Sequence, residues 1–407
     1  MKPSYRFMAL ALIVTLLLAA CQPVQVPAAG TSGPQTYTLG VAQPFTGPLG
    51  SFGTDFGKGI ELAVEEMNAQ LTAAGSNVQF QIASADTEGT PDGAAKAVQT
   101  VVQSSGAQVV VGPLTTSEIL GAKQFADDNG IVLVAPASSG VAGAIAGDNI
   151  FRLMNPPDTF GGKAFLQIMA ERGYQNLVIL QVDDVFGNGL TELIQAGFGG
   201  GGEVVVIKYA PDPPDLSGEA SNASAEVARL AASGSTAFFC VCFLGDAQKL
   251  LQQATVDANL GTVDWLGVEN LRNEELLQDS AAAAFLGKVN FTSVSASERS
   301  TPNTQPFKDA FMAKHGSEPG PFTNYAYDAA NVAMLAMIAA NNSGEGVKAI
   351  LPFIANHYIG TQVQTYLDEN GDQAIAYLAV YEIADDGSEF VEIGAYDGAT
   401  DTLTLTQ

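Results

Sequence analysis

The stretch from Val109 to Gly140 constrains the fold of this chain more than any other. It contains a short buried strand at Val109–Val111, an amphipathic helical segment and a second buried strand at Ile131–Ala135. Two such strands joined by one helix form a βαβ unit, in which the strands are parallel and the crossover is right-handed. The pattern therefore predicts a parallel α/β sheet.

Both strands of this unit end in loops rich in hydroxyl groups, Thr115–Ser117 and Ala137–Ser139. Because parallel strands place their carboxyl ends at the same sheet edge, the two loops face one crevice, the usual ligand site of such sheets. Thr115 also begins a helix, where free N–H groups and the helix dipole favour an anion such as a carboxylate. The same residues could instead only cap a helix and close a turn.

The first segment indicates export from the cytoplasm. Lys2 and Arg6 precede the apolar run Met8–Ala20, whose roughly 13 residues are too few for a permanent transmembrane helix. Small residues then lead to Cys21, an arrangement that resembles the bacterial lipobox. We expect a lipoprotein signal peptide at 1–20, a lipid on Cys21 and a flexible Pro- and Gly-rich tether at 21–36.

Composition limits the partners. The formal net charge of −26 disfavours nucleic acid, because phosphate contacts need Lys and Arg. Apart from Cys21, the cysteines are Cys240 and Cys242. They are spaced i, i+2 on an apolar strand, where a bridge between them is geometrically unfavourable, so both are expected to be small buried apolar residues.

A second series of strands and helices follows a Pro-rich hinge at Pro156–Pro157. Strands are expected at 177–182, 203–209, 237–243, 263–267 and 288–292. Helices are expected at 305–315, 324–340 and 347–356. The tail changes to strand periodicity at 361–367, 374–383 and 390–397, which predicts antiparallel additions to a sheet.

Motifs for covalent chemistry or metal binding are weak. The two histidines, His315 and His357, have no second ligand at metal spacing, and no GxSxG segment occurs. GTDFGKG at 53–59 lacks the Ser or Thr and the glycine spacing of a phosphate loop, so we expect a loop that enters a helix. DENGD at 368–372 is expected to be a hairpin turn, because a calcium loop needs a downstream Glu. We predict no metal, no cofactor and no enzymatic activity.

Several segments match a family when they are taken in order. They are GVAQPFTGPLGSFG, DTEGTPDGAAKAVQTVV, VVVGPLTTSEIL, APASSG, VDDVFGNG, LGVEN and NYAYDAANVAM. Their order and spacing resemble the type I periplasmic solute-binding proteins of ABC importers, most of all the branched-chain amino-acid-binding group. The resemblance covers nearly all of Thr38 to Asp397.

The resemblance implies two doubly wound, Rossmann-like α/β lobes with parallel central sheets and a hinge of three crossovers. The N-terminal lobe would comprise 37–156 and about 288–357. The C-terminal lobe would comprise 157–287 and about 358–407. A solute would be enclosed between the lobes by hinge closure.

The resemblance also implies site residues. Thr116 would bind the ligand carboxylate by its hydroxyl, and Ala137 and Ser139 would bind the head group. Glu269 would take the α-ammonium, which suits a zwitterion because it needs donors at one end and an acceptor at the other. Glu269 could instead be a surface residue, and Asp158 could assist the head group or only cap a helix.

Departures from the family pattern affect the pocket. Where the family commonly places tyrosines, this chain has Phe52, Phe186 and Phe243, so we expect a more apolar pocket, or core positions for these rings. Asn270 replaces a usual glycine. The full set of expected ligand residues is Phe52, Thr115, Thr116, Ala137, Ser138, Ser139, Asp158, Phe186, Phe243 and Glu269.

These features predict a monomeric, lipid-anchored, extracytoplasmic receptor. It would bind a branched-chain or other hydrophobic amino acid and deliver it to ABC permease subunits. The alternative is a receptor of the same fold that senses amides, amino acids or aromatic compounds in signalling.

Overall fold

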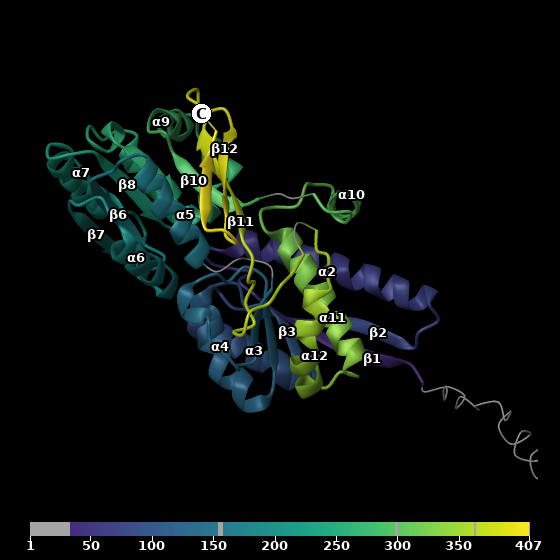
Figure 1. The fold of residues 1–407 in the computed structure, drawn as a ribbon. Coiled ribbons are helices and arrows are strands. Elements are labelled where there is room, and N and C mark those ends of the chain that lie inside the picture. The colour runs from purple at the N-terminus through teal and green to yellow at the C-terminus, as the bar shows by residue number, and fades with distance from the viewer. Residues whose placement is uncertain (1–32, 154–157, 298–299, 362–363, 407) are drawn as a thin grey trace, which may run out of the picture.

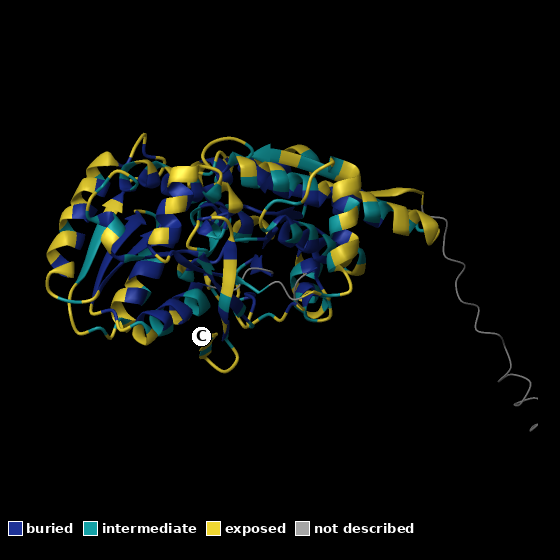
Figure 2. Ribbon diagram, turned by 90° about the horizontal axis from the view of Figure 1, so that it is seen from above, coloured by how far each residue is buried: buried dark blue, intermediate teal, exposed yellow. Residues whose placement is uncertain are grey.

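The computed structural model describes residues 33–153, 158–297, 300–361 and 364–406. These residues form two α/β lobes, each built around its own sheet (Figure 1). In each lobe the buried strands lie between helices whose outer faces are exposed (Figure 2). The signal peptide, Cys21, most of the tether and the hinge prolines Pro156 and Pro157 lie outside the described residues.

The first lobe contains a parallel five-stranded sheet in the order β2-β1-β3-β4-β5. Val109 and Val111 pack against one face and Val110 against the other, because successive strand side chains point to opposite faces. The helices α3 and α4 cover one face, and α2, α11 and α12 cover the other. The elements are β1 (Gln35–Gln43), α2 (Gly50–Ala73), β2 (Val78–Asp86), α3 (Pro91–Ser105), β3 (Val109–Val111), α4 (Thr116–Asn129), β4 (Val132–Ala135), η1 (Val141–Gly143), β5 (Ile150–Arg152), α10 (Thr304–His315), α11 (Thr323–Ala339) and α12 (Gly344–Asn356).

Local sequence determines the ends of these helices. The Thr90 side chain accepts a hydrogen bond from Gly93 N, and Pro91 occupies the first turn of α3. Gly106 ends the helix with φ of 73°. Thr115 caps α4 in a reciprocal capping box with Glu118. The GTDFGKG segment, expected as a loop, lies inside α2; Gly53 permits close contact there, since a Cβ would lie 2.1 Å from the Pro44 carbonyl oxygen.

The second lobe contains an eight-stranded sheet in the order β13-β12-β11-β10-β9-β8-β6-β7. The strands β6 to β10 are parallel, and β11, β12 and β13 extend the sheet in antiparallel fashion, as the tail predicts. The elements are α5 (Asp158–Glu171), β6 (Asn176–Val182), α6 (Val185–Gly197), β7 (Val204–Tyr209), α7 (Ser217–Ala231), β8 (Thr236–Val241), α8 (Leu244–Ala254), η2 (Leu260–Thr262), β9 (Asp264–Gly267), η3 (Glu269–Leu271), η4 (Glu274–Leu277), α9 (Ser280–Lys288), β10 (Thr292–Ala296), β11 (Tyr377–Ile383), β12 (Phe390–Asp397) and β13 (Thr402–Leu405).

The lobe boundary expected near 288 is wrong. The helix α9 continues to Lys288, and the following strand, β10, begins only at Thr292. Because β10 pairs with both β9 and β11, it belongs to the sheet of the second lobe. The chain therefore returns to the first lobe after Ala296.

The boundary expected near 358 also lies later. The Tyr358 hydroxyl donates to Asp328 Oδ1 at 2.9 Å, and Thr361 N donates to Oδ2 of the same carboxylate at 2.7 Å. These bonds hold residues 358–361 against α11 of the first lobe. In the described part of 361–367 only isolated bridges form, Ile359 with Gln364 and Leu367 with Gln373, so the strand expected there is not continuous.

Cys240 and Cys242 form a disulfide, which corrects the expectation that they stay unbridged. Their Cα atoms are 5.4 Å apart, within the range that a disulfide spans. The strand β8 ends at Val241, so Cys242 is not held at the spacing of two extended residues. Both cysteines are buried, as the sequence predicts.

Candidate functional site

A cavity lies between the lobes at the carboxyl ends of the parallel strands of both sheets. Its empty space is about 620 Å³, part of it open to solvent. Nine of the ten residues expected from the sequence line it; Asp158 is the exception. The lining residues are Leu49, Phe52, Phe56, Leu114, Thr115, Thr116, Ala137, Ser138, Ser139, Phe186, Phe243, Glu269, Asn270 and Phe322.

The first lobe contributes a group of buried hydroxyls. Thr116 Oγ1 lies 2.9 Å from Ser138 Oγ and accepts a hydrogen bond from Gly140 N at 2.9 Å. Ser139 is buried beside them. The start of α4 and the loop after β4 meet here, as expected for the ends of adjacent parallel strands.

The Thr115 hydroxyl is used in the capping box. It accepts from Glu118 N at 3.2 Å, while Thr115 N donates to Glu118 Oε2 at 2.8 Å. The Thr87 hydroxyl donates to the other carboxylate oxygen of Glu118. Burial raises the pKa of Glu118, and these hydrogen bonds oppose that shift. The capping role left open for Thr115 is therefore observed. The capping box holds the loop that leads into α4 in place.

Two aromatic rings of the second lobe form the opposite wall. Phe186 and Phe243 stack with ring centroids 5.6 Å apart and an interplanar angle of 28°. Phe186 lies at the start of α6, and Phe243 is the residue that precedes α8. Phe52 approaches from α2 of the first lobe. All three rings also pack against the hydrophobic cores, so the core position left open for them is partly correct.

Glu269 follows β9 and begins the short helix η3, where it is half-buried. The neighbouring Asn270 also lines the cavity, and its buried Oδ1 has no hydrogen-bond partner among the described residues. A glycine would offer no such group. Asn270 therefore adds a polar atom to the cavity beside Glu269.

Asp158 lines a second, smaller cavity of about 370 Å³ of empty space instead of the main one. Phe186 and Glu269 border both cavities, so the two adjoin. Asp158 Oδ2 is buried with no hydrogen-bond partner in the described chain. Burial raises the pKa of Asp158 to about 6, against the opposing effects of a hydrogen bond with Ser139 and the charge of Arg152.

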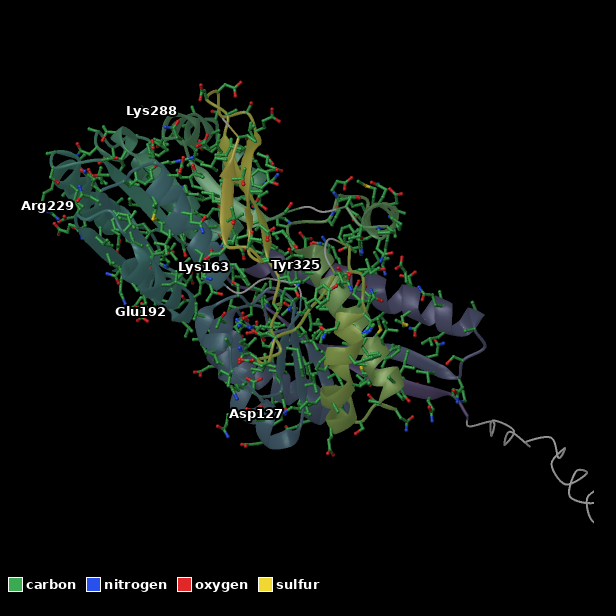
Figure 3. All side chains as sticks on the ribbon, in the orientation of Figure 1. Asp127, Lys163, Glu192, Arg229, Lys288 and Tyr325 are labelled. Carbon is green, nitrogen blue, oxygen red and sulfur yellow. A yellow bond between two sulfur atoms is a disulfide. The ribbon has the colours of Figure 1, made fainter. Side chains whose placement is uncertain are left out.

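The two lobes touch beside the main cavity. The Ser117 hydroxyl donates to Asp184 Oδ2 at 3.3 Å, which joins the start of α4 to the residue that caps α6. Charged residues such as Asp127, Glu192 and Arg229 lie on outer parts of the lobes (Figure 3). None of these three residues lines the main cavity.

Sequence reasoning missed four apolar lining residues. Leu114 directly precedes Thr115, and Leu49 lies within the GVAQPFTGPLGSFG segment, so a position in or next to a motif was the available signal. Phe56 is on the helical stripe of α2 that otherwise faces the core. Phe322, with φ of 61°, precedes α11 and carries no local signal.

Two general properties can be stated for the described part of the chain. It has no helix long and apolar enough to cross a membrane. It also has no group of three or more His, Cys, Asp or Glu residues placed to hold a metal ion.

Known proteins resemble this chain over both lobes. The family model described as periplasmic binding protein matches residues 36–388. The Leu/Ile/Val-binding protein BraC3 of Rhizobium johnstonii is 25% identical over 351 residues, covering 85% of this chain and 91% of that protein. The crystal structure of a leucine-binding protein, LivK, of Thermotoga maritima has a TM-score of 0.75 at 19% identity, covering 89% of this chain and 99% of that one.

A solute-binding protein of an ABC transporter from R. palustris, solved in complex with benzoate, has a TM-score of 0.71 at 20% identity. The match covers 91% of this chain and 98% of that protein's chain. The structural likenesses confirm the two-lobed type I fold expected from the sequence. With the family model matching most of its length, this chain belongs to the periplasmic binding protein family.

Proposed function

We propose that this protein captures a hydrophobic α-amino acid, of the branched-chain class or similar, between its lobes and delivers it to an ABC permease. One observation carries the proposal. A single cavity combines hydroxyl groups of the first lobe with a carboxylate and two aromatic rings of the second. In this proposal the protein binds and releases its solute without covalent chemistry.

The polar groups suit the two ends of a zwitterion. Thr116, Ser138 and Ser139 offer hydroxyls to a carboxylate, next to the positive end of the α4 dipole. Glu269 offers a carboxylate to the ammonium group from the other lobe. A ligand that contacts both would hold the lobes together and shift the population toward the closed arrangement, which the permease would recognise.

The apolar lining favours a hydrophobic side chain. Seven apolar side chains larger than alanine face the cavity: Leu49, Phe52, Phe56, Leu114, Phe186, Phe243 and Phe322. Burying a side chain such as leucine against them contributes about 1.5–3 kcal/mol. The name of the Rhizobium relative, a Leu/Ile/Val-binding protein, supports the same ligand class.

Isothermal titration calorimetry with L-leucine tests the proposal. We expect wild-type protein to bind L-leucine and Glu269→Gln to bind it at least about tenfold more weakly, because the charge on the ammonium partner is lost. Glu192→Gln is the matched control, since Glu192 is exposed on the outer surface of α6 (Figure 3). If Glu269→Gln binds L-leucine as well as wild type does, the assignment of the zwitterion is wrong.

A second candidate is an aromatic carboxylate. The five phenylalanines in the cavity favour it, and the R. palustris structure contains benzoate. An aromatic acid lacks the ammonium group, so its affinity would survive Glu269→Gln. Binding of benzoate but not of L-leucine by wild type would favour this candidate.

Transport, sensing and anchoring need separate tests. Uptake of radiolabelled ligand into vesicles that contain the cognate permease would support delivery, whereas binding without uptake would favour a sensing receptor. For the lipid anchor, Cys21→Ser should move the protein from the membrane fraction to the soluble fraction. Equal membrane fractions for both proteins would refute the role of Cys21.

A further inference from the structure

Arg152, the last residue of β5, is almost completely buried, with 1% of its surface exposed. A buried guanidinium needs partners for both its charge and its N–H groups. Arg152 Nε donates to Asp372 Oδ1 at 2.6 Å, and Nη2 donates to Oδ2 of the same carboxylate. The pair joins residues 220 positions apart and has the bidentate geometry that gives strong orientation.

A third donor of Arg152 bonds to Gly140, directly after the Ala137–Ser139 loop. Nη1 donates to the carbonyl oxygen of Gly140 at 2.7 Å. Gly140 is also held through its N–H, which donates to Thr116 Oγ1, and Thr116 Oγ1 in turn lies 2.9 Å from Ser138 Oγ. A continuous series of hydrogen bonds therefore runs from Asp372 through Arg152 and Gly140 to the hydroxyls that line the main cavity.

The loop is shaped around the guanidinium group. A Cβ on Gly143 would lie 2.8 Å from Arg152 Nη1 and 3.1 Å from Cζ, so a larger residue would displace one or the other. Gly143 N also donates to the Gly140 carbonyl oxygen at 3.0 Å. Arg152 and Gly143 thus both donate to the carbonyl oxygen of Gly140, and together they hold the loop around Gly140 in place.

Both members of the ion pair lie where the chain passes between the lobes. Arg152 comes shortly before α5, the first helix of the second lobe, and Asp372 comes shortly before β11 of that lobe. Arg152 N donates to the Gly371 carbonyl oxygen at 2.9 Å, and Gln373 N donates to the Arg152 carbonyl oxygen at 2.9 Å. Backbone and side-chain bonds together fasten two of the three interlobe passages to each other.

We infer that Arg152 is a positioning residue of the ligand site. It orients Gly140, and through Gly140 the hydroxyls of Thr116 and Ser138, and it links this loop to the interlobe passages through Asp372. The inference rests on the proposed function, because it assigns those hydroxyls to the ligand. Arg152 itself does not line either cavity that adjoins Glu269.

Two sets of variants test the inference. Arg152→Lys keeps the positive charge but cannot form the bidentate pair together with the Gly140 bond. The double variant Arg152→Met/Asp372→Asn removes both charges, so it leaves no unpaired carboxylate buried. It serves as the test if Arg152→Lys fails to fold. The readouts are the Kd for L-leucine and for benzoate, and the hydrogen–deuterium exchange of the amides from 138 to 143.

A less buried Arg–carboxylate pair far from the cavity provides the control. Arg172 Nη2 pairs with Glu382, and Nη1 donates to Thr292 Oγ1 at 2.7 Å, all within the second lobe. Arg172→Lys and Arg172→Met/Glu382→Gln make the same chemical changes there. These control variants should keep the wild-type Kd within about twofold and should not change exchange at 138–143.

We expect the Arg152 variants to raise the Kd of whichever probe wild type binds by at least about tenfold, and to speed exchange at 138–143. Unchanged Kd in a folded Arg152 variant overturns the inference, and so does a weaker Kd without faster exchange. If wild type binds neither probe, the proposed function fails for these ligand classes. The exchange measurement then still decides whether Arg152 holds the loop.

Discussion

The backbone N–H of Asp158 donates to the carbonyl oxygen of Ser139 at 2.9 Å. Asp158 is the first residue of α5 in the second lobe, and Ser139 belongs to the hydroxyl loop of the first lobe. The loop that would bind a ligand carboxylate is therefore bonded directly to the start of the other lobe. Movement of α5 relative to β4 would strain this bond, so lobe geometry and loop geometry are coupled.

Thr116→Val should weaken binding without large unfolding. The change removes the hydroxyl that accepts from Gly140 N and contacts Ser138. Loss of a hydrogen bond to a charged group costs about 1.5–3 kcal/mol, which corresponds to a Kd higher by about 10- to 100-fold. Thr116→Ser keeps the hydroxyl and is the control. Calorimetry with L-leucine compares the three proteins, and equal affinity of Thr116→Val would exclude a contact between this hydroxyl and the ligand.

Phe243→Ala should reduce affinity for a hydrophobic or aromatic ligand. The ring of Phe243 is half-buried, lines the cavity and stacks on Phe186, so its removal takes away both ligand contact and a ring partner. We expect a loss of about 1.5–3 kcal/mol of binding free energy. Phe353→Ala is the control, because Phe353 is 59% exposed on α12. A Phe243→Ala protein with wild-type Kd would show that the ring serves the core alone.

Protein stability should depend on pH through Asp158 and Asp328. Burial raises the pKa of both carboxyls from 3.8 to about 6. The folded protein then holds these protons more tightly than the unfolded chain, so the contribution of each group is full below about pH 3.8 and is lost as the pH rises through about 6. Each raised pKa corresponds to at most about 3 kcal/mol. Urea unfolding between pH 4 and pH 8, which lie on either side of the raised pKa of about 6, should show a weaker pH dependence in Asp158→Asn and in Asp328→Asn.

The pH dependence of ligand affinity should distinguish the Asp158 carboxyl from the Asp328 carboxyl. Asp158 lines the cavity that shares Glu269 with the main site, whereas Asp328 bonds to Tyr358 and Thr361 within the first lobe. Above about pH 6 the Asp158 carboxylate adds negative charge to the cavity that Glu269 also borders, so affinity for L-leucine, whose ammonium group we assign to Glu269, should rise as the pH passes through this value. Asp158→Asn should abolish that rise, and Asp328→Asn should preserve it. A rise that persists in Asp158→Asn would assign it to another group.

The sequence by itself determined the features encoded between near neighbours in the chain. The alternation of strands and helices, the ends of α3 at Thr90 and Gly106, and the hydroxyl loops that follow β3 and β4 could all be predicted. Their common physical basis is local, because side-chain periodicity, capping and the shared edge of parallel strands involve short separations. The resemblance to a family added Phe186, Phe243 and Glu269, whose spacing from Thr116 carries no local signal.

Only the tertiary structure decided which distant groups meet. The strand β10 joins the second lobe because it pairs with β9 and β11, whereas its hydrophobic pattern would suit either lobe. Phe322 reaches the cavity and Arg152 pairs with Asp372 because the chain passes between the lobes more than once. Such contacts depend on how complete lobes pack and on where the chain crosses, and neither is encoded in the residues beside Arg152 or Phe322. The sequence thus predicted which kinds of side chain form the site, and the packing of the two lobes decided how those side chains come together.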